Sequence, residues 1–367
     1  MQDITRLLRR DEKVTLSLRS LYEKYGYRKF RMNRFEEYDF YAMHRDFLVG
    51  GQIISFTDLD GKLMALRPDM TLSIVKKAKD QAAGSERLYY TEPVYRPARG
   101  AAGYRESFQV GVEYIGDVTP YASVEMVSLA TQSLAQIGPD YVLDLSHTGY
   151  IGGLLASLPL EADVRAAVRV CIEGKNAHEL SGLVDGLLPA EEAGRLVAVA
   201  RLSGPFAQTL AQARALAEGP EMHAAVDELE ALYASMAASG EADPLRLDFS
   251  ISSDAKYYSG LMMRGYISGV PSAVLSGGRY DPLLKRMGKP QLSAMGFAVY
   301  FDELAQYFSA EADCTVDTVV LYGRDTSPAA VAHVVQSRIA RGERVWAGTA
   351  PPEGIRYKQV LEVDGHA

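Results

Sequence analysis

The polar residues Arg96, Gln109 and Glu113 stand in two stretches whose aromatic and β-branched residues predict neighbouring β-strands. In the second stretch, 108–115, apolar residues alternate with Gln109 and Glu113, and a period of two places these polar residues on one open face. The intervening loop, 97–103, contains the proline and glycine residues that favour turns. A guanidinium, an amide and a carboxylate on a strand pair could hold a small zwitterion or a phosphate.

A second polar pair, Asp69 and Thr71, lies between a predicted hairpin and a predicted helix. Residues 53–66 form two apolar stretches around an Asp-Gly dipeptide at 60–61, which is a strong signal for a tight hairpin turn. Residues 72–79 predict a short helix. From residue type alone, Asp69 and Thr71 could serve only to cap the start of that helix.

Residues 92–113 resemble motif 2 of the class II aminoacyl-tRNA synthetases, in the form found in histidyl-tRNA synthetases. The resemblance implies that Arg96 meets ATP and the carboxylate of the amino acid. It also implies that Gln109 and Glu113 help to hold a histidine substrate.

Two further segments resemble the same family. Residues 66–71, Leu-Arg-Pro-Asp-Met-Thr, resemble its Leu-Arg-Pro-Glu-Gly-Thr motif, and the resemblance implies that Asp69 and Thr71 hold the α-amino group of histidine. Tyr257 and Tyr258 match a tyrosine pair that lines the histidine pocket in that family.

The resemblance covers roughly residues 10–135 and 245–305, and it implies an α+β fold in which both parts belong to one antiparallel sheet. We expect four parts: a class II synthetase-like core, first part (1–148), a helical insertion (149–244), the second part of the core (245–310) and a small C-terminal α/β module (311–367). Alanine and leucine at helical spacing, interrupted by proline, predict roughly three to five helices in the insertion. In the C-terminal module, residues 318–322, 329–341 and 355–363 predict a strand, a helix and a second strand.

Near the N-terminus, apolar residues at helical spacing predict a helix over 2–24. Residues 29–36 then resemble motif 1, which builds the dimer interface of class II synthetases, although Asn33 stands where the family has a proline. The resemblance therefore implies a dimer formed through this region.

The chain has 367 residues, of which 47% are hydrophobic and 23% charged, a composition typical of a globular protein. No segment is long and apolar enough to span a bilayer, and the charged N-terminus lacks a signal-peptide pattern, so we expect a cytoplasmic protein with no membrane partner. Cys171 and Cys314 lie far apart and the six histidines are dispersed. We therefore expect reduced thiols, no metal site and no cofactor.

The net charge of −8 is concentrated in one segment. Residues 151–245 contain six Lys and Arg against fourteen Asp and Glu, whereas the remainder of the chain is balanced. Because affinity for nucleic acid depends on positive charge, this acidic segment predicts that the chain has no nucleic-acid partner.

Two positions depart from the synthetase pattern where an active enzyme needs cations. Ser253 stands where the family has an arginine that stabilises charge on the activating carboxylate and the α-phosphate. Glu303 stands where motif 3 ends in an arginine that pairs the γ-phosphate of ATP. Two like charges about 4 Å apart repel by about 4 kcal/mol at an effective dielectric constant of about 20, so Glu303 opposes ATP binding in the synthetase pose.

A histidine pocket without the residues that activate histidine resembles the regulatory subunits of ATP phosphoribosyltransferase, which are paralogues of histidyl-tRNA synthetase. The resemblance implies a non-catalytic subunit, paired with a short catalytic subunit in a hetero-octamer, that supports the first step of histidine biosynthesis and transmits feedback inhibition by histidine. Two alternatives stay open: a divergent histidyl-tRNA synthetase, or a synthetase-like paralogue that serves another partner. The residues also leave open whether histidine binds in this pocket or at a subunit interface.

Overall fold

The computed structural model describes residues 8–48, 52–78, 84–97, 103–251, 257–310 and 315–363. The chain divides into two compact units, one of Val14–Leu304 and one of Met1–Lys13 with Ala305–Ala367. Within the described residues, no helix is long and apolar enough to cross a membrane, and no three His, Cys, Asp or Glu side chains gather as a metal site requires. The domain boundaries at 148, 244 and 310 stay predictions.

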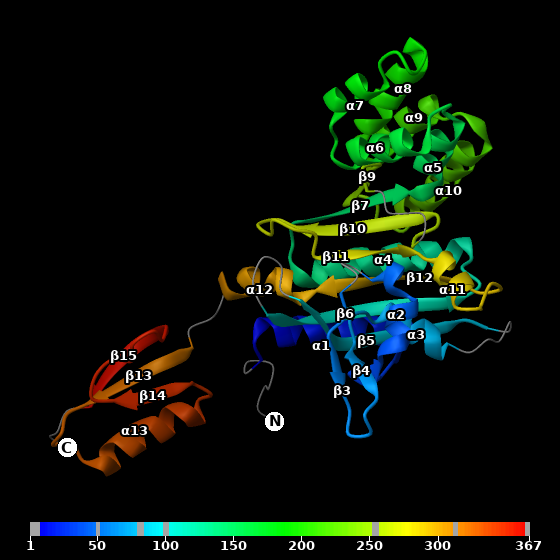
Figure 1. The fold of residues 1–367 in the computed structure, drawn as a ribbon. Helices are drawn as coiled ribbons and strands as arrows, with labels where there is room; N and C mark the ends of the chain where they lie inside the picture. The colour runs from blue at the N-terminus through cyan, green and yellow to red at the C-terminus, as the bar shows by residue number, and fades with distance from the viewer. Residues whose placement is uncertain are drawn as a thin grey trace. The chain divides into compact units, whose positions relative to one another are not determined.

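The larger unit is built on one sheet with the strand order β1-β5-β6-β12-β11-β10-β7-β9-β8 (Figure 1). The strands are β1 (Arg28–Lys29), β5 (Glu86–Pro97), β6 (Tyr104–Gly116), β7 (Tyr141–His147), β8 (Ser203–Pro205), β9 (Leu245–Asp248), β10 (Leu261–Ile267), β11 (Leu275–Arg279) and β12 (Ser293–Tyr300). Neighbouring strands are antiparallel except for β1 with β5 and β7 with β9. Strands from before and after the insertion alternate within this sheet, so the predicted single sheet of two chain segments is confirmed.

The central hairpin of β5 and β6 is longer than the stretches that predicted it, and its register pairs Glu92 with Gln109 and Leu88 with Glu113. The sequence predicts an open polar face here, and that prediction is wrong. Gln109 is 3% exposed and Glu113 is 2% exposed, because side chains from later elements cover this face as well.

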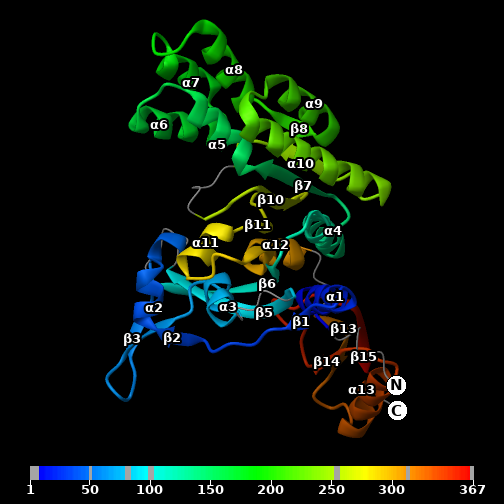
Figure 2. The same cartoon turned by 90° about the vertical axis from the view of Figure 1, so that its right-hand side faces the viewer.

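The helices of the larger unit surround the sheet (Figure 2). Their bounds are α2 (Tyr38–Met43), a 3-10 turn η2 (Arg45–Phe47), α3 (Thr71–Lys77), α4 (Pro120–Ile137) and α11 (Asp281–Arg286). Helices α1 (Arg10–Lys24) and α12 (Phe301–Ala310) each have residues in both units. Thr119 Oγ1 accepts a hydrogen bond from the backbone N–H of Ala122 at 3.2 Å, and proline at the next position suits the first turn, so α4 begins at Pro120.

The first helix begins later than the sequence predicts. Leu8 and Arg9 are described and are not helical, and α1 starts at Arg10. The Glu12 carboxylate accepts a hydrogen bond from the backbone N–H of Arg9 at 2.8 Å, which satisfies a donor that the helix leaves unpaired at its start.

Aromatic packing holds α1 on the sheet. The Tyr22 ring lies 6.1 Å from the Tyr89 ring and 6.3 Å from the Phe297 ring, and the Tyr22 side chain is fully buried. Tyr89 also donates a hydrogen bond to Glu23 at 2.6 Å. Each side chain of this size contributes about 1.5–3 kcal/mol on burial, so this cluster fixes α1 against β5 and β12.

A small antiparallel sheet, β2 (Phe35–Glu37), β4 (Leu63–Leu66) and β3 (Ser55–Thr57), precedes α3. The predicted hairpin of β3 and β4 is confirmed. Asp58 Oδ1 accepts hydrogen bonds from the backbone N–H groups of Asp60 and Lys62, and Gly61 has φ of 80°, a conformation that favours glycine. Strand β4 then leads directly into the segment that carries Asp69 and Thr71.

The insertion contains six described helices rather than three to five, and it is not entirely helical. The helices are α5 (Thr148–Ser157), α6 (Ala162–Glu173), α7 (Ala177–Val184), α8 (Ala190–Ala200), α9 (Phe206–Leu216) and α10 (Gly219–Ala238), and they lie beside β7 and β9 (Figures 1 and 2). Five of them have only 8–12 residues, so the insertion accommodates more helices than the sequence predicts. Strand β8 pairs with β9 and carries the insertion back to the core sheet.

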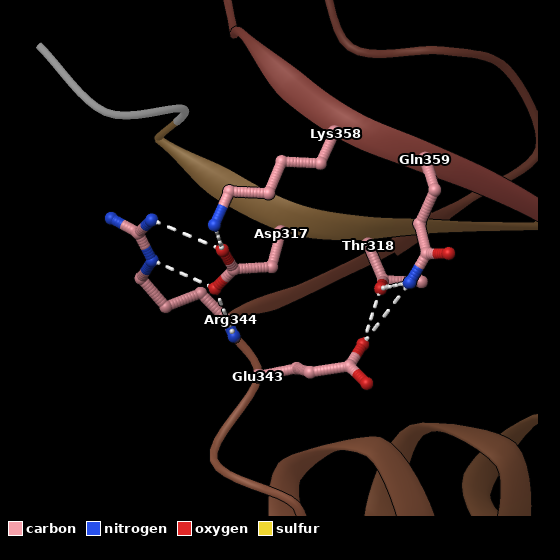
Figure 3. Close-up of polar contacts among 6 residues, drawn as sticks. All are labelled: Asp317, Thr318, Glu343, Arg344, Lys358 and Gln359. Carbon is pink, nitrogen blue, oxygen red and sulfur yellow. Dashed lines mark hydrogen bonds and ion pairs between the residues drawn. The ribbon is translucent and has the colours of Figure 1, made fainter. Parts of the chain in front are cut away.

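The C-terminal module is a parallel sheet of order β14-β13-β15 with one helix. Its elements are β13 (Val316–Tyr322), α13 (Pro328–Ala340), β14 (Val345–Gly348) and β15 (Tyr357–Val363), of which β14 was not predicted. Arg344 Nε and Lys358 Nζ lie 3.0 and 2.7 Å from the Asp317 carboxylate, which ties all three strands together (Figure 3). The hydrogen bonds from Arg344 and Lys358 hold the pKa of Asp317 well below its usual value.

Candidate functional site

All seven residues singled out from the sequence line one cavity of about 270 Å³ in the larger unit. They are Asp69, Thr71, Arg96, Gln109, Glu113, Tyr257 and Tyr258. Pockets for drug-sized ligands measure about 300–1,000 Å³, so this cavity suits a smaller metabolite. Its walls come from β5, β6, β11 and β12 and from the segments that precede α3 and β10.

Glu113 lies at the base of the cavity, where two hydroxyl groups bind its carboxylate. Thr71 Oγ1 donates to Oε1 at 2.8 Å, and Tyr280 donates to Oε2 at 2.6 Å. The pKa of Glu113 is raised to about 8, chiefly by burial; the two hydrogen bonds oppose this shift and the nearby Asp69 carboxylate adds to it. Glu113 is therefore largely protonated at neutral pH.

Asp69 both supports α3 and faces the cavity. Its Oδ1 accepts a hydrogen bond from the backbone N–H of Leu72 at 2.9 Å, as the capping interpretation predicts. Burial raises the pKa of Asp69, while the Leu72 N–H and the Arg96 guanidinium lower it. Thr71 uses its hydroxyl for Glu113 instead of capping the helix. A capped, buried carboxylate beside a cavity can hold an ammonium group in a fixed position.

Arg96 and Gln109 supply the donors of the cavity. Arg96 Nε donates to the backbone oxygen of Pro68 at 3.1 Å, which orients the guanidinium next to the segment that carries Asp69. The amide nitrogen of Gln109 is buried and has no hydrogen-bond partner among the described residues. A buried unsatisfied donor costs about 1–3 kcal/mol, so a ligand that accepts from Gln109 would recover that free energy.

Glycine makes room for the Glu113 carboxylate. Gly296 of β12 stands opposite Glu113 of β6, and a Cβ at Gly296 would lie 1.9 Å from Glu113 Oε2. A Cβ at Gly277 would lie 2.2 Å from the backbone oxygen of Gly296. Gly277 is therefore needed for packing against the neighbouring strand, and it also lines the cavity.

The aromatic wall extends beyond the predicted tyrosine pair. The rings of Tyr257 and Tyr258 meet edge to face with centroids 4.5 Å apart, and Phe47 of η2 packs 5.9 Å from Tyr257. Sequence reasoning missed further lining residues, among them the polar and aromatic side chains of Asp46, Phe47, Tyr90, Ser276, Tyr280 and Tyr300. Tyr280 had a usable signal, because it follows the Gly277-Gly278 pair; the others had none.

Glu303 does not line the cavity. Its carboxylate accepts a hydrogen bond from the Ser272 hydroxyl at 2.5 Å, and the neighbouring Asp302 accepts from the backbone N–H of Phe108 at 3.3 Å. These acids anchor the start of α12. Ser253 and Cys314 lie outside the described residues.

This sheet, with its cavity at the central hairpin, defines a class II aminoacyl-tRNA synthetase-like core. The sequence profile described as histidyl-tRNA synthetase matches residues 5–304, and the chain belongs to the histidyl-tRNA synthetase family. Relatives named as regulatory subunits of ATP phosphoribosyltransferase, at 25–34% identity, confirm the resemblance to that group predicted from the sequence.

Two curated relatives illustrate the two kinds of protein that this chain resembles. The chain is 34% identical over 260 residues to the "ATP phosphoribosyltransferase regulatory subunit" of Moorella thermoacetica, a match that covers 69% of this chain and 66% of that protein. It is 27% identical over 295 residues to the "Histidine--tRNA ligase" of Methanocaldococcus jannaschii, covering 79% and 70%. The chain thus spans slightly less than two thirds of the length of the first relative.

Two solved structures share the fold. An ATP phosphoribosyltransferase regulatory subunit/histidyl-tRNA synthetase from Bacillus halodurans superposes with a TM-score of 0.76 at 24% identity, covering 96% of this chain and 93% of that chain. A chain of the HisG:HisZ ATP phosphoribosyltransferase complex from Thermotoga maritima superposes with a TM-score of 0.63 at 16% identity, covering 82% and 97%.

Proposed function

We propose that this chain is a non-catalytic regulatory subunit of ATP phosphoribosyltransferase. In this role it supports a short catalytic subunit in the first step of histidine biosynthesis and transmits feedback inhibition by histidine. The names of its relatives support the proposal, and the geometry of the cavity supports histidine as the effector.

The observation that carries the proposal is the donor and acceptor set of the cavity. Asp69 pairs the α-ammonium group of histidine, Arg96 pairs the carboxylate, and Glu113 accepts a hydrogen bond from the imidazole. The buried amide of Gln109 supplies a donor that lacks a partner among the described residues. Thr71 holds Glu113 through its hydroxyl, and Tyr257 and Tyr258 enclose the ring.

The same site is unsuited to activating histidine. Activation with ATP depends on cations placed where negative charge develops. At the end of β12 the chain offers Asp302 and Glu303, whose carboxylates are already bound by other parts of the fold. We therefore expect no aminoacylation and no adenylate formation by this chain.

The proposal includes an assembly. The catalytic subunit is the partner, in a hetero-octamer of the kind that the resemblance implies, and two copies of this chain pair through the motif 1-like region. Phe35 and Phe56 support that dimer, because their rings meet edge to face at 5.7 Å while they remain 51% and 38% exposed. Exposed aromatic pairs of this kind mark protein interfaces. The proposal keeps the cytoplasmic location and the absence of a nucleic-acid partner expected from the sequence.

A histidyl-tRNA synthetase is the second candidate, since one relative carries the name histidine–tRNA ligase. ATP–pyrophosphate exchange dependent on histidine separates the two. Exchange that scales with the concentration of the purified chain would reject the regulatory proposal.

The direct test is the phosphoribosyltransferase activity of a short catalytic subunit, measured with and without this chain and over a titration of histidine. We expect the catalytic subunit to gain activity when this chain is added, and histidine to inhibit only the mixture. Equal activity and equal inhibition without this chain would refute the proposal.

A further inference from the structure

A second cavity, of about 830 Å³, lies between α4 and α10 in the larger unit. It shares no lining residue with the cavity around Glu113, which we call the histidine cavity. We call it the α4–α10 groove. Its lining includes Tyr121, Val124, Ala231 and Leu232 from these two helices. The proposed function does not use this groove.

The groove is an exposed surface feature rather than an enclosed pocket. Tyr121 is 65% exposed at its edge, and Ala231, Ser235 and Ser239 present an exposed face of α10 to it. Apolar surface exposed beside polar residues marks a site of protein contact. Two adjacent helices with a groove between them also form the geometry that accepts an amphipathic helix from a partner.

Two carboxylates give the groove a negative charge. His147 Nδ1 accepts from the backbone N–H of Gly149, so Nε2 carries the proton and donates to Glu228 at 3.2 Å. That hydrogen bond lowers the pKa of Glu228, which is therefore ionised at neutral pH. Glu241 receives hydrogen bonds from two neutral groups, the Ser128 hydroxyl at 2.6 Å and the Gln132 amide at 2.8 Å, which do not neutralise its charge.

The remaining charges at the groove cancel within the fold. Glu125 lies 3.2 Å from the Arg87 guanidinium and accepts a hydrogen bond from Tyr27. Arg279, the only cation among the described lining residues, pairs with Asp281 at 2.7 Å. The groove therefore presents apolar surface with a net negative charge, and its complement is an apolar segment that carries lysine or arginine.

We propose that the α4–α10 groove docks a basic amphipathic segment of the catalytic subunit. Apolar side chains of that segment fill the space between Val124 and Leu232, and its cations face Glu228 and Glu241. This inference rests on the proposed function, because it takes the catalytic subunit as the partner.

The groove and the histidine cavity share a strand. Arg279 of β11 lines the groove, while Ser276 and Gly277 of the same strand line the histidine cavity. The backbone N–H of Ser259, which follows Tyr258, also donates to the backbone oxygen of Arg279 at 2.8 Å. The proposal therefore places a docked segment and a bound histidine on the same short strand.

The test uses a matched pair of variants on α10. Ala231 is exposed and lines the groove, whereas Ala237 is exposed on another face of the same helix and does not line it. Arginine is close to alanine in helix propensity, so A231R and A237R keep α10 intact and add the same charge. Calorimetric histidine affinity equal to that of the wild type checks that each variant is folded.

We expect A231R to weaken binding of the purified catalytic subunit by about 30-fold or more, the effect of a central interface residue, and A237R to stay within about twofold. The double variant Glu228→Gln/Glu241→Gln should weaken it too, mainly through slower association, as loss of steering charge does. If A231R binds the catalytic subunit with wild-type affinity, the docking proposal is refuted while the proposed function stands. A change in self-association of A231R without loss of partner affinity also refutes it, and failure of the wild-type chain to bind any short catalytic subunit refutes both.

Discussion

Tyr280 donates a hydrogen bond of 2.6 Å to Glu113 Oε2, and this contact joins residues 167 positions apart in the chain. Glu113 lies on β6, before the insertion, and Tyr280 precedes α11, after it. Both side chains are 2% exposed. The base of the cavity therefore exists only when the two chain segments pair in one sheet.

Removing either carboxylate of the cavity should weaken histidine binding. Glu113→Ala or Asp69→Ala leaves an imidazole N–H or an ammonium group unpaired in a confined site. Such a loss costs about 1–3 kcal/mol, or roughly 5- to 150-fold in affinity. We expect both variants to relieve histidine inhibition of the assembled enzyme by a factor in this range.

Asp117→Ala is the matched control, because Asp117 is exposed just beyond β6. Size-exclusion chromatography shows whether each complex still assembles. Unchanged inhibition in assembled complexes of both variants would place the effector site elsewhere, such as at a subunit interface.

Histidine binding should depend on pH through Glu113. The carboxylate accepts the imidazole N–H, but its pKa of about 8 leaves it largely protonated at pH 7. The fraction of competent sites rises as pH increases through this pKa, so affinity should increase roughly fivefold between pH 7 and pH 8. Calorimetry at pH 7 in buffers of different ionisation enthalpy should detect release of a proton on binding. A flat profile, or proton uptake, would contradict this assignment.

Glu113 should also make the wild-type protein less stable as pH rises. A carboxyl with a pKa of about 4.3 when unfolded and about 8 when folded binds more protons in the folded state between these values, so its contribution to stability is lost across this interval. Glu113→Gln has no such proton. The free energy of unfolding of the variant minus that of the wild type should increase by at least about 1 kcal/mol from pH 5 to pH 8, as measured by urea denaturation at both pH values. An equal difference at both would contradict the buried, protonated state of Glu113.

The C-terminal module should depend on Asp317. Asp317→Asn removes the charge that holds Arg344 and Lys358 and should destabilise the module by about 1–3 kcal/mol at pH 7. The pKa of Asp317 is depressed, so this stability is present above the unfolded value of about 3.9 and is lost as pH falls. Trp346 of β14 is the single tryptophan of the chain, so its fluorescence during urea unfolding reports on this module.

The exposed Asp325 provides the control Asp325→Asn. Equal urea midpoints for Asp317→Asn, Asp325→Asn and the wild type at pH 7 would show that the ion cluster contributes nothing to the module.

Local sequence predicted many of the elements and part of the site. The period of two in 108–115 predicted β6, the Asp-Gly turn predicted the β3–β4 hairpin, and family motifs predicted seven of the residues that line the cavity. These signals are local, because strand alternation, turn chemistry and motif order depend on neighbouring residues.

The tertiary structure alone decided what those residues do to one another. Alternation in β6 could not show that its polar face is covered, because the covering residues Tyr280 and Gly296 come from strands and loops beyond the insertion. The raised pKa of Glu113, the unpaired amide of Gln109 and the charge of the α4–α10 groove arise in the same way. Burial and unpaired charge are sums over every neighbour in space, and those neighbours are brought together only when distant segments pair in one sheet.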